Sequence, residues 1–292
     1  MKRSKQGKES IVRIGLFLCA LMVVGYVLLI CVYLILAGIP AIREVGLWQF
    51  LLGTVWAPTH SDVPQFGILP MILTSLYGTL AAIALGVPIG IGTALYLSKL
   101  ASPRTATVLR PMIHLLAGIP SVVYGLIGML VLVPALRVTF ALPAGDSLLA
   151  AILVLAVMLL PSVISLSDNA LRAVPREYEE GSLALGATEI ETFFRVSVKA
   201  ARSGLAAAMV LGIGRAIGET MAIVMVAGNV ANLPSLFQSV RFLTTGIAIE
   251  MNYAAPGSLQ RNALFSIGLV LFVFILLSNL VLQLVLRRGE KH

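Results

Sequence analysis

The sequence predicts an all-α, polytopic membrane protein with six transmembrane helices. Hydrophobic residues make up 59% of the 292-residue chain and charged residues only 12%, whereas a soluble domain carries about 25% charged residues. The mean hydropathy is +0.99, and apolar runs of about 20 residues, long enough to cross a bilayer as a helix, recur along the chain. The same composition excludes an intrinsically disordered chain, which is poor in large aliphatic residues.

The first predicted helix spans residues 14–39 and follows a basic tail, residues 1–13. A cleaved signal peptide is the alternative. The apolar run, however, is longer than the roughly 7–15 residues of such a segment, and no A-x-A cleavage site follows it. We therefore expect an uncleaved transmembrane helix.

Five further helices are predicted within one transmembrane domain, residues 66–286, which a tail of residues 287–292 follows. Their ranges are 66–97, 108–136, 148–166, 204–230 and 263–286. Small residues four positions apart, Gly86 with Gly90 and Gly214 with Gly218, predict close approach between helices.

The distribution of basic residues orients these helices. The segments on one side of the predicted helices hold 16 Lys and Arg residues; these segments are 1–13, 98–111, 168–202 and 287–292. The segments on the opposite side hold 4; these are 38–65, 137–147 and 231–262. Basic residues are enriched on the cytoplasmic side, so both termini are predicted to be cytoplasmic, in an inner or plasma membrane. The net charge of +8 then reflects orientation among lipids and does not indicate a nucleic-acid partner.

Motifs for catalysis or cofactor binding are absent from the sequence. There is no P-loop, no H-E-x-x-H and no C-x-x-C. The three histidines are scattered, and Cys19 and Cys31 lie about 18 Å apart on one helix, too far for a disulfide. We expect a chain that is not an enzyme and binds no metal or cofactor.

The loop of residues 168–202 has its own pattern of signals. Apolar residues from Leu171 to Leu185 repeat at helical spacing and predict an amphipathic helix. Gly186 is a candidate left-handed helix end, and Thr188 with Glu191 has the spacing of a capping box, which predicts a second short helix. Two interpretations stay open: a helix that docks in the groove of a partner, and a connector that touches only lipid headgroups.

A signature in this loop resembles the E-A-A-x3-G-x9-I-x-L-P motif of the membrane subunits of ATP-binding-cassette (ABC) importers. The matching residues are Glu180, Gly181, Ser182, Gly186, Val196 and Val198. Gly181 and Ser182 replace two alanines, and Lys199 replaces the closing proline. The resemblance implies that this loop docks on a cytoplasmic ATPase.

Three further stretches narrow the resemblance to phosphate-specific importer permeases of the PstC type; they are residues 116–125, 215–222 and 241–251. The likeness covers about residues 10–288. It implies a second, homologous permease of the PstA type, two copies of a PstB-type ATPase that uses the ATP, and an extracytoplasmic phosphate-binding protein of the PstS type. A permease for sulfate or molybdate, or an ion-coupled secondary carrier, remains as an alternative.

Arg215 and Glu219 lie within an apolar segment, where a charge costs about 2.5–3.5 kcal/mol at the helix centre. Their spacing of four places them on one helical face, so they can form a structural ion pair. In the other interpretation they line the substrate path together with Thr220, and the guanidinium binds phosphate oxygens bidentately. The resemblance favours the path, and both interpretations stay open.

The predicted orientation can be tested with single cysteines in a Cys-free background. We expect an impermeant thiol reagent on intact cells to label Ser61→Cys and not Ser182→Cys, because basic residues place 38–65 outside and 168–202 inside. Labelling of Ser182→Cys alone would reverse the orientation.

Overall fold

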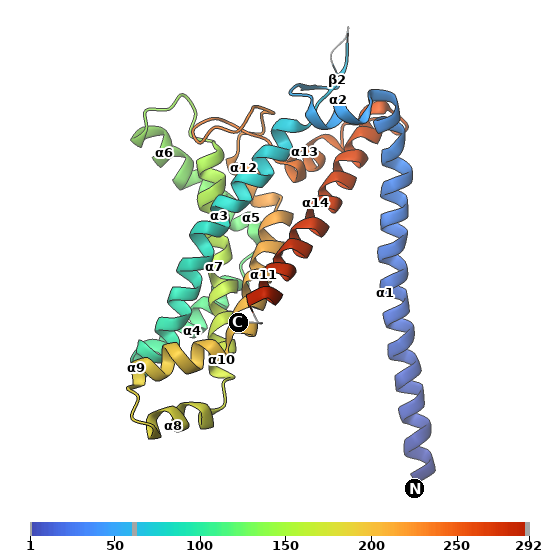
Figure 1. Ribbon diagram of the computed structural model, residues 1–292. Coiled ribbons are helices and arrows are strands. Elements are labelled where there is room, and N and C mark those ends of the chain that lie inside the picture. The colour runs from blue at the N-terminus through green and yellow to red at the C-terminus, as the bar shows by residue number, and fades with distance from the viewer. Residues whose placement is uncertain (1, 60–62, 290–292) are drawn as a thin grey trace.

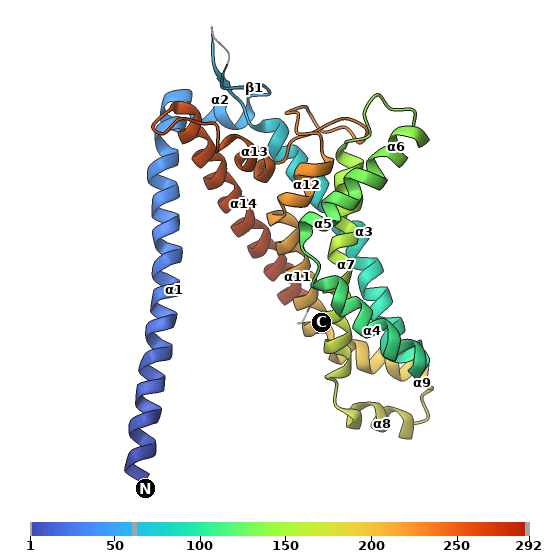
Figure 2. The same cartoon turned by 180° about the vertical axis from the view of Figure 1, so that it is seen from behind.

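The computed structural model describes residues 2–59 and 63–289, which are mostly helical (Figures 1 and 2). Five helices in these ranges are long and apolar enough to cross a membrane: Val12–Val45, Leu69–Leu100, Ser121–Thr139, Leu148–Arg172 and Leu259–Leu280. A sixth results if Glu189–Ala200 and Arg202–Gly218, which meet at 63°, count as one bent span. The predicted all-α, multi-pass fold class is confirmed.

Three helices form the centre of the bundle: α3 (Leu69–Leu95), α7 (Leu148–Arg172) and α11 (Arg202–Gly218). Helix α3 approaches α7 closely because glycines lie between them. A β-carbon on Gly86 would stand 3.0 Å from the carbonyl oxygen of Ala156, and one on Gly90 would stand 2.8 Å from Cγ1 of Val163. The close approach predicted for Gly86 and Gly90 is confirmed.

The second glycine pair behaves differently. No atom of the described chain lies within 4 Å of a β-carbon built on Gly214 or Gly218. The close approach predicted for this pair is therefore not formed between helices of the described residues.

Among the described residues, helix α1 (Lys2–Val45) stands beside the bundle and meets it only near its own C-terminal end, against α14 (Leu259–Gly289; Figures 1 and 2). There the Ser266 hydroxyl donates to the Gly38 carbonyl at 2.6 Å. The side chains of residues 12–30 are all exposed. Their apolar surface has no protein cover in this chain and is suited to lipid.

The span predicted at 108–136 is two separate helices, so that boundary was wrong. Helix α4 (Pro103–Ala117) ends at Gly118, and the membrane-spanning stretch begins at Ser121. Pro120 lacks an N–H and disfavours the helical conformation of the residue before it, so the helix cannot continue. The span then comprises α5 (Ser121–Ile127), the π-helical turn η2 (Gly128–Leu132) and α6 (Val133–Thr139).

A polar network closes the end of the bundle at which α1 meets it. It joins the hairpin of β1 (Trp56–Ala57) and β2 (Gln65–Phe66), which follows α2 (Leu47–Leu52), to α13 (Leu243–Glu250). The Glu250 carboxylate accepts the indole N–H of Trp56 at 2.8 Å and forms an ion pair with Arg241. This network ties segments nearly 200 residues apart in the sequence.

The opposite end of the bundle consists of short elements, two of which contribute Leu97 and Phe193 to an apolar cluster that also includes Leu171 and Leu205. The elements are η1 (Tyr96–Leu100), α8 (Arg176–Ala184), α9 (Glu189–Thr192), η3 (Phe193–Ser197) and α10 (Val198–Ala200). They place the loop predicted to dock on a partner directly beneath the central helices (Figure 1).

The contact between α3 and α7 can be tested through Gly90→Val. The added methyl groups overlap Val163, and such overpacking costs about 1–3 kcal/mol. We expect the purified chain in detergent to unfold at a temperature lower by at least about 3 °C. Gly214→Val, with open space around it, is the matched control and should leave the unfolding temperature unchanged. An equal shift in both variants would contradict the assigned contact.

Candidate functional site

The span predicted at 204–230 is interrupted near its middle. Helix α11 ends at Gly218, Glu219 is extended (φ −68°, ψ 134°), and the short helix α12 (Met221–Val226) begins after Thr220. Such a break frees backbone polar groups at membrane depth, which is tolerated only where protein or a water-filled path satisfies them. It therefore marks this level of the bundle as a candidate site.

Glu219 satisfies part of this break itself. Its side chain is 9% exposed, and Oε1 accepts the backbone N–H of Ala222 at 3.1 Å. A carboxylate at this position also lies favourably at the positive N-terminal end of α12. The Glu219 carbonyl accepts the hydroxyl of Thr244 at 3.0 Å, so α13 lies against the break.

Arg215 lies one turn before the break and is half-buried. Its guanidinium donates to the Ser162 hydroxyl of α7 at 2.8 Å. The three ion pairs among the described residues do not include one between Arg215 and Glu219. The predicted pairing is therefore not formed, because the helix ends between the two residues and the face they were expected to share is lost.

Thr220, the third predicted path residue, is half-buried at the start of α12. Its hydroxyl donates to the Gly218 carbonyl over 3.4 Å, a long and weak contact. No capping bond to α12 engages it. The break thus gathers a guanidinium and two hydroxyl groups, those of Ser162 and Thr220, beside a carboxylate already committed to backbone.

This arrangement suits an anion. A guanidinium without a carboxylate partner offers several N–H donors in a fixed fork, which matches the oxygens of a phosphate-like group. In the described part of the chain no three His, Cys, Asp or Glu side chains gather in a way that could hold a metal ion.

The second candidate site is the loop of residues 168–202, whose local structure follows the predicted signals in part. Gly186 has φ +87°. The backbone N–H of Gly186 donates to the carbonyl of Leu183, and that of Ala187 donates to the carbonyl of Ser182. This pair of hydrogen bonds is typical of a Schellman helix end. The capping box of Thr188 and Glu191 starts α9. Both of these local predictions are confirmed.

One loop prediction fails. The single amphipathic helix expected from Leu171 to Leu185 is two helices, since α7 ends at Arg172 and α8 begins at Arg176. Pro175 cannot donate the backbone hydrogen bond that a continuous helix needs. The break lets α8 turn away from the axis of α7 (Figure 1).

The predicted docking residues differ in exposure. Glu180, Gly181 and Gly186 are exposed, while Ser182 is half-buried and its hydroxyl bonds that of Thr192 at 2.9 Å. Val196 and Val198 are half-buried, and Val198 packs against the apolar cluster of Leu97 and Phe193. Val198 thus supports the loop from within, while Glu180, Gly181 and Gly186 face outward.

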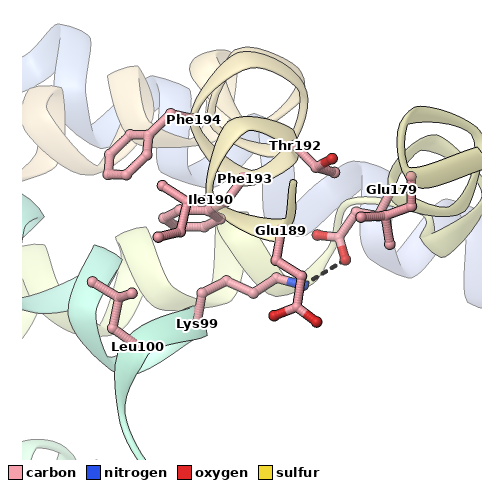
Figure 3. Close-up of a pocket in the computed structure, with 9 residues that line it drawn as sticks. Lys99, Leu100, Glu179, Glu189, Ile190, Thr192, Phe193 and Phe194 are labelled. Carbon is pink, nitrogen blue, oxygen red and sulfur yellow. Dashed lines mark hydrogen bonds and ion pairs between the residues drawn. The ribbon is translucent and has the colours of Figure 1, made fainter. Parts of the chain in front are cut away.

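Residues that sequence reasoning missed line a pocket of about 190 Å³ beside α8 (Figure 3). Lys99 of η1 bonds Glu179 at 2.5 Å, and the Ser197 hydroxyl donates to the other Glu179 oxygen at 2.7 Å. Burial alone would raise the pKa of Glu179, but the hydrogen bonds from Lys99 and Ser197 and the positive charges of Lys99 and Arg176 outweigh it, so the pKa is lowered. Lys99 and Glu179 are 80 residues apart, and no sequence signal joins them.

Comparison with known proteins places these sites in context. The family model described as binding-protein-dependent transport system inner membrane component matches residues 86–291. The probable ABC transporter permease protein YqgH of Bacillus subtilis is 40% identical over 283 residues, which cover 94% of this chain and 91% of that protein. The phosphate transport system permease protein PstC of Haemophilus influenzae is 34% identical over 288 residues, covering 89% and 90%.

A solved structure shares the fold. An inward-facing conformation of the MetNI methionine ABC transporter superposes with a TM-score of 0.58 over 76% of this chain and 95% of that chain. The sequence identity is 20%, so the likeness concerns the fold alone.

The Gly186 turn can be tested with Gly186→Val. A β-branched residue is strained at φ +87°, so the turn should open and the amides of residues 186 and 187 should exchange hydrogen about ten-fold faster. Gly186→Asn is the matched control, because asparagine tolerates this conformation, and it should leave exchange nearly unchanged. Equal exchange in both variants would show that the turn does not depend on glycine.

Proposed function

Because the chain belongs to the family of binding-protein-dependent transport system inner membrane components, we propose that it forms the phosphate path of an ABC importer. Members of this family are the multi-pass, non-catalytic membrane subunits of such importers, so the chain works with a separate ATPase and a substrate-binding protein. The proposal concerns the substrate, the residues that meet it and the identity of the partners.

Phosphate is favoured by the site and by the relatives together. Relatives that align with about nine-tenths of this chain are named phosphate transport permeases. The observation that carries the proposal is the Arg215 guanidinium, which lies beside a broken span and bonds a neutral hydroxyl instead of a carboxylate. A positive charge is costly at membrane depth and is typical of a substrate path.

In the proposed mechanism Arg215 attracts the phosphate dianion and orients it through two N–H donors. Ser162 holds the guanidinium in place, and Thr220 adds a hydroxyl at the break. Glu219 stabilises α12 and keeps a negative charge near the site, which limits how tightly the anion is held. The anion is then released when the path closes to the outside and opens to the cytoplasm.

The cytoplasmic loop is proposed to dock on the ATPase through Glu180, Gly181, Ser182 and the turn at Gly186, with Val196 and Val198 supporting it. Helix α8 has no buried residue, and Tyr178 and Leu185 on this segment are 56% and 90% exposed. Exposed apolar side chains on a cytoplasmic helix are typical of an interaction surface. A connector that touches only headgroups is the alternative outcome.

The assembly we propose contains this chain, a homologous permease of the PstA type, two copies of a PstB-type ATPase and a PstS-type phosphate-binding protein outside. ATP is bound by the ATPase, and this chain holds no cofactor. Both termini are proposed to lie in the cytoplasm, as the 16-to-4 distribution of basic residues indicates.

The role of Arg215 can be tested by phosphate uptake into cells or proteoliposomes that contain the assembled importer. We expect Arg215→Gln to lower uptake at least about ten-fold without loss of assembly, because a neutral amide cannot attract a dianion. Arg215→Lys should also be impaired, because an ammonium does not reproduce the bidentate fork.

The double variant Arg215→Gln with Glu219→Gln separates the two interpretations. Since the two residues form no ion pair here, removing both should not restore uptake. An assembled double variant that transports at the normal rate would show that Arg215 serves structure and not the path. If the importer takes up sulfate or molybdate instead of phosphate, Arg215 still lines the substrate path, but the proposed substrate is wrong.

A further inference from the structure

We propose that Lys99, Glu179 and Ser197 form a clasp that positions α8 and transmits its movement to α3. The proposal rests on the proposed docking of α8 on an ATPase and deepens it, because it names the residues that carry the movement into the membrane. Glu179 and Lys99 are then positioning residues, distinct from those that contact the partner.

Helix α8 is held in place mainly by side-chain hydrogen bonds. None of the residues of α8 is buried, so apolar packing does not fix this helix against the bundle. Pro175 precedes it and the Gly186 turn follows it. Its position therefore depends on side-chain hydrogen bonds to neighbouring elements.

The hydrogen bonds of Glu179 lead to η1 and η3. Glu179 accepts a bond from Lys99, in the turn η1 at the end of α3, and another from Ser197 of η3. Figure 3 shows the Lys99 ammonium extended toward Glu179 beneath Phe193 and Ile190. Among the described residues, the side-chain hydrogen bond that joins α8 directly to the end of α3 is the one that Lys99 donates to the Glu179 carboxylate.

From this clasp, helix α3 runs across the membrane. Near its outer end the Ser75 hydroxyl accepts the backbone N–H of Leu243, the first residue of α13. The next residue, Thr244, bonds the Glu219 carbonyl at the broken span. A shift of α3 would therefore move α13 through the Ser75 bond, and α13 would move the candidate phosphate site through the Thr244 bond.

The two adjacent carboxylates consequently have separate roles. Glu180 is exposed, whereas the Glu179 side chain is 20% exposed and engaged by two donors. Neighbouring residues on a helix point about 100° apart, so one faces the bundle and the other faces outward. The substitution of Ala by Ser182 in the signature strengthens this side, because its hydroxyl bonds Thr192 of α9.

The test is a charge exchange in the complete importer, reconstituted with its second permease, ATPase and binding protein. Lys99→Glu and Glu179→Lys should each lower the phosphate transported per ATP about three-fold or more, while ATP hydrolysis continues. The double variant, which restores the pair in reverse, should recover most of the lost ratio. Glu177→Lys, an exposed site on the same helix with the same charge change, should leave the ratio unchanged.

A second readout needs no substrate. In a background without Cys19 and Cys31, the labelling of Thr220→Cys is compared between the nucleotide-free and vanadate-trapped importer. The nucleotide-dependent change in labelling should shrink in each single variant and return in the double variant.

The outcomes separate the clasp from the proposed function. Single variants that keep both the normal ratio and the normal labelling change overturn the clasp, as does a double variant no better than the single ones. If the wild type takes up no phosphate but its labelling responds to nucleotide, phosphate is the wrong substrate, and the labelling alone decides on the clasp.

Discussion

The structure depends on one constraint of the bilayer: every backbone polar group at membrane depth needs a partner inside the protein. Helices end after Ala117, where the span Ser121–Thr139 follows, and after Gly218, and at each place a side chain from another segment bonds the freed backbone. The Tyr124 hydroxyl donates to the Leu116 carbonyl at the first break. Thr244 and the Glu219 carboxylate serve the second. These repairs decide which segments must lie together.

The second repair also explains why a positive charge remains available. Had α11 continued through residue 219, Glu219 would lie one turn from Arg215 and would neutralise it. The break turns the carboxylate toward the backbone of α12 and leaves the guanidinium with a neutral hydroxyl. A single interruption of one helix therefore leaves the guanidinium of the proposed anion site without a carboxylate partner among the described residues.

The sequence carries the parts of this fold that depend on local chemistry. Apolar run lengths indicate a multi-pass helical protein, and the left-handed turn at Gly186 and the capping box at Thr188 form as predicted, because each is specified within a few residues. The breaks at Pro120 and Glu219 were missed, since a hydropathy window averages over them. The open face at Gly214 and the Lys99–Glu179 bond depend on which helices meet, and spacing alone does not encode that. The roles assigned to Arg215, Glu219, Thr220 and the loop signature remain predictions.

Helix α1 has a consequence for how this protein is made and how it varies. Residues 12–30 are all exposed in the described part of the chain, so the stability of this stretch comes mainly from transfer into lipid. The effect of a substitution in this stretch on stability therefore depends on the hydrophobicity of the new side chain and not on its shape. The helix can therefore insert from the ribosome before the remaining spans exist. Its sequence can also drift among aliphatic residues during evolution, while α3 and α7, which interlock at Gly90 and Val163, must change together.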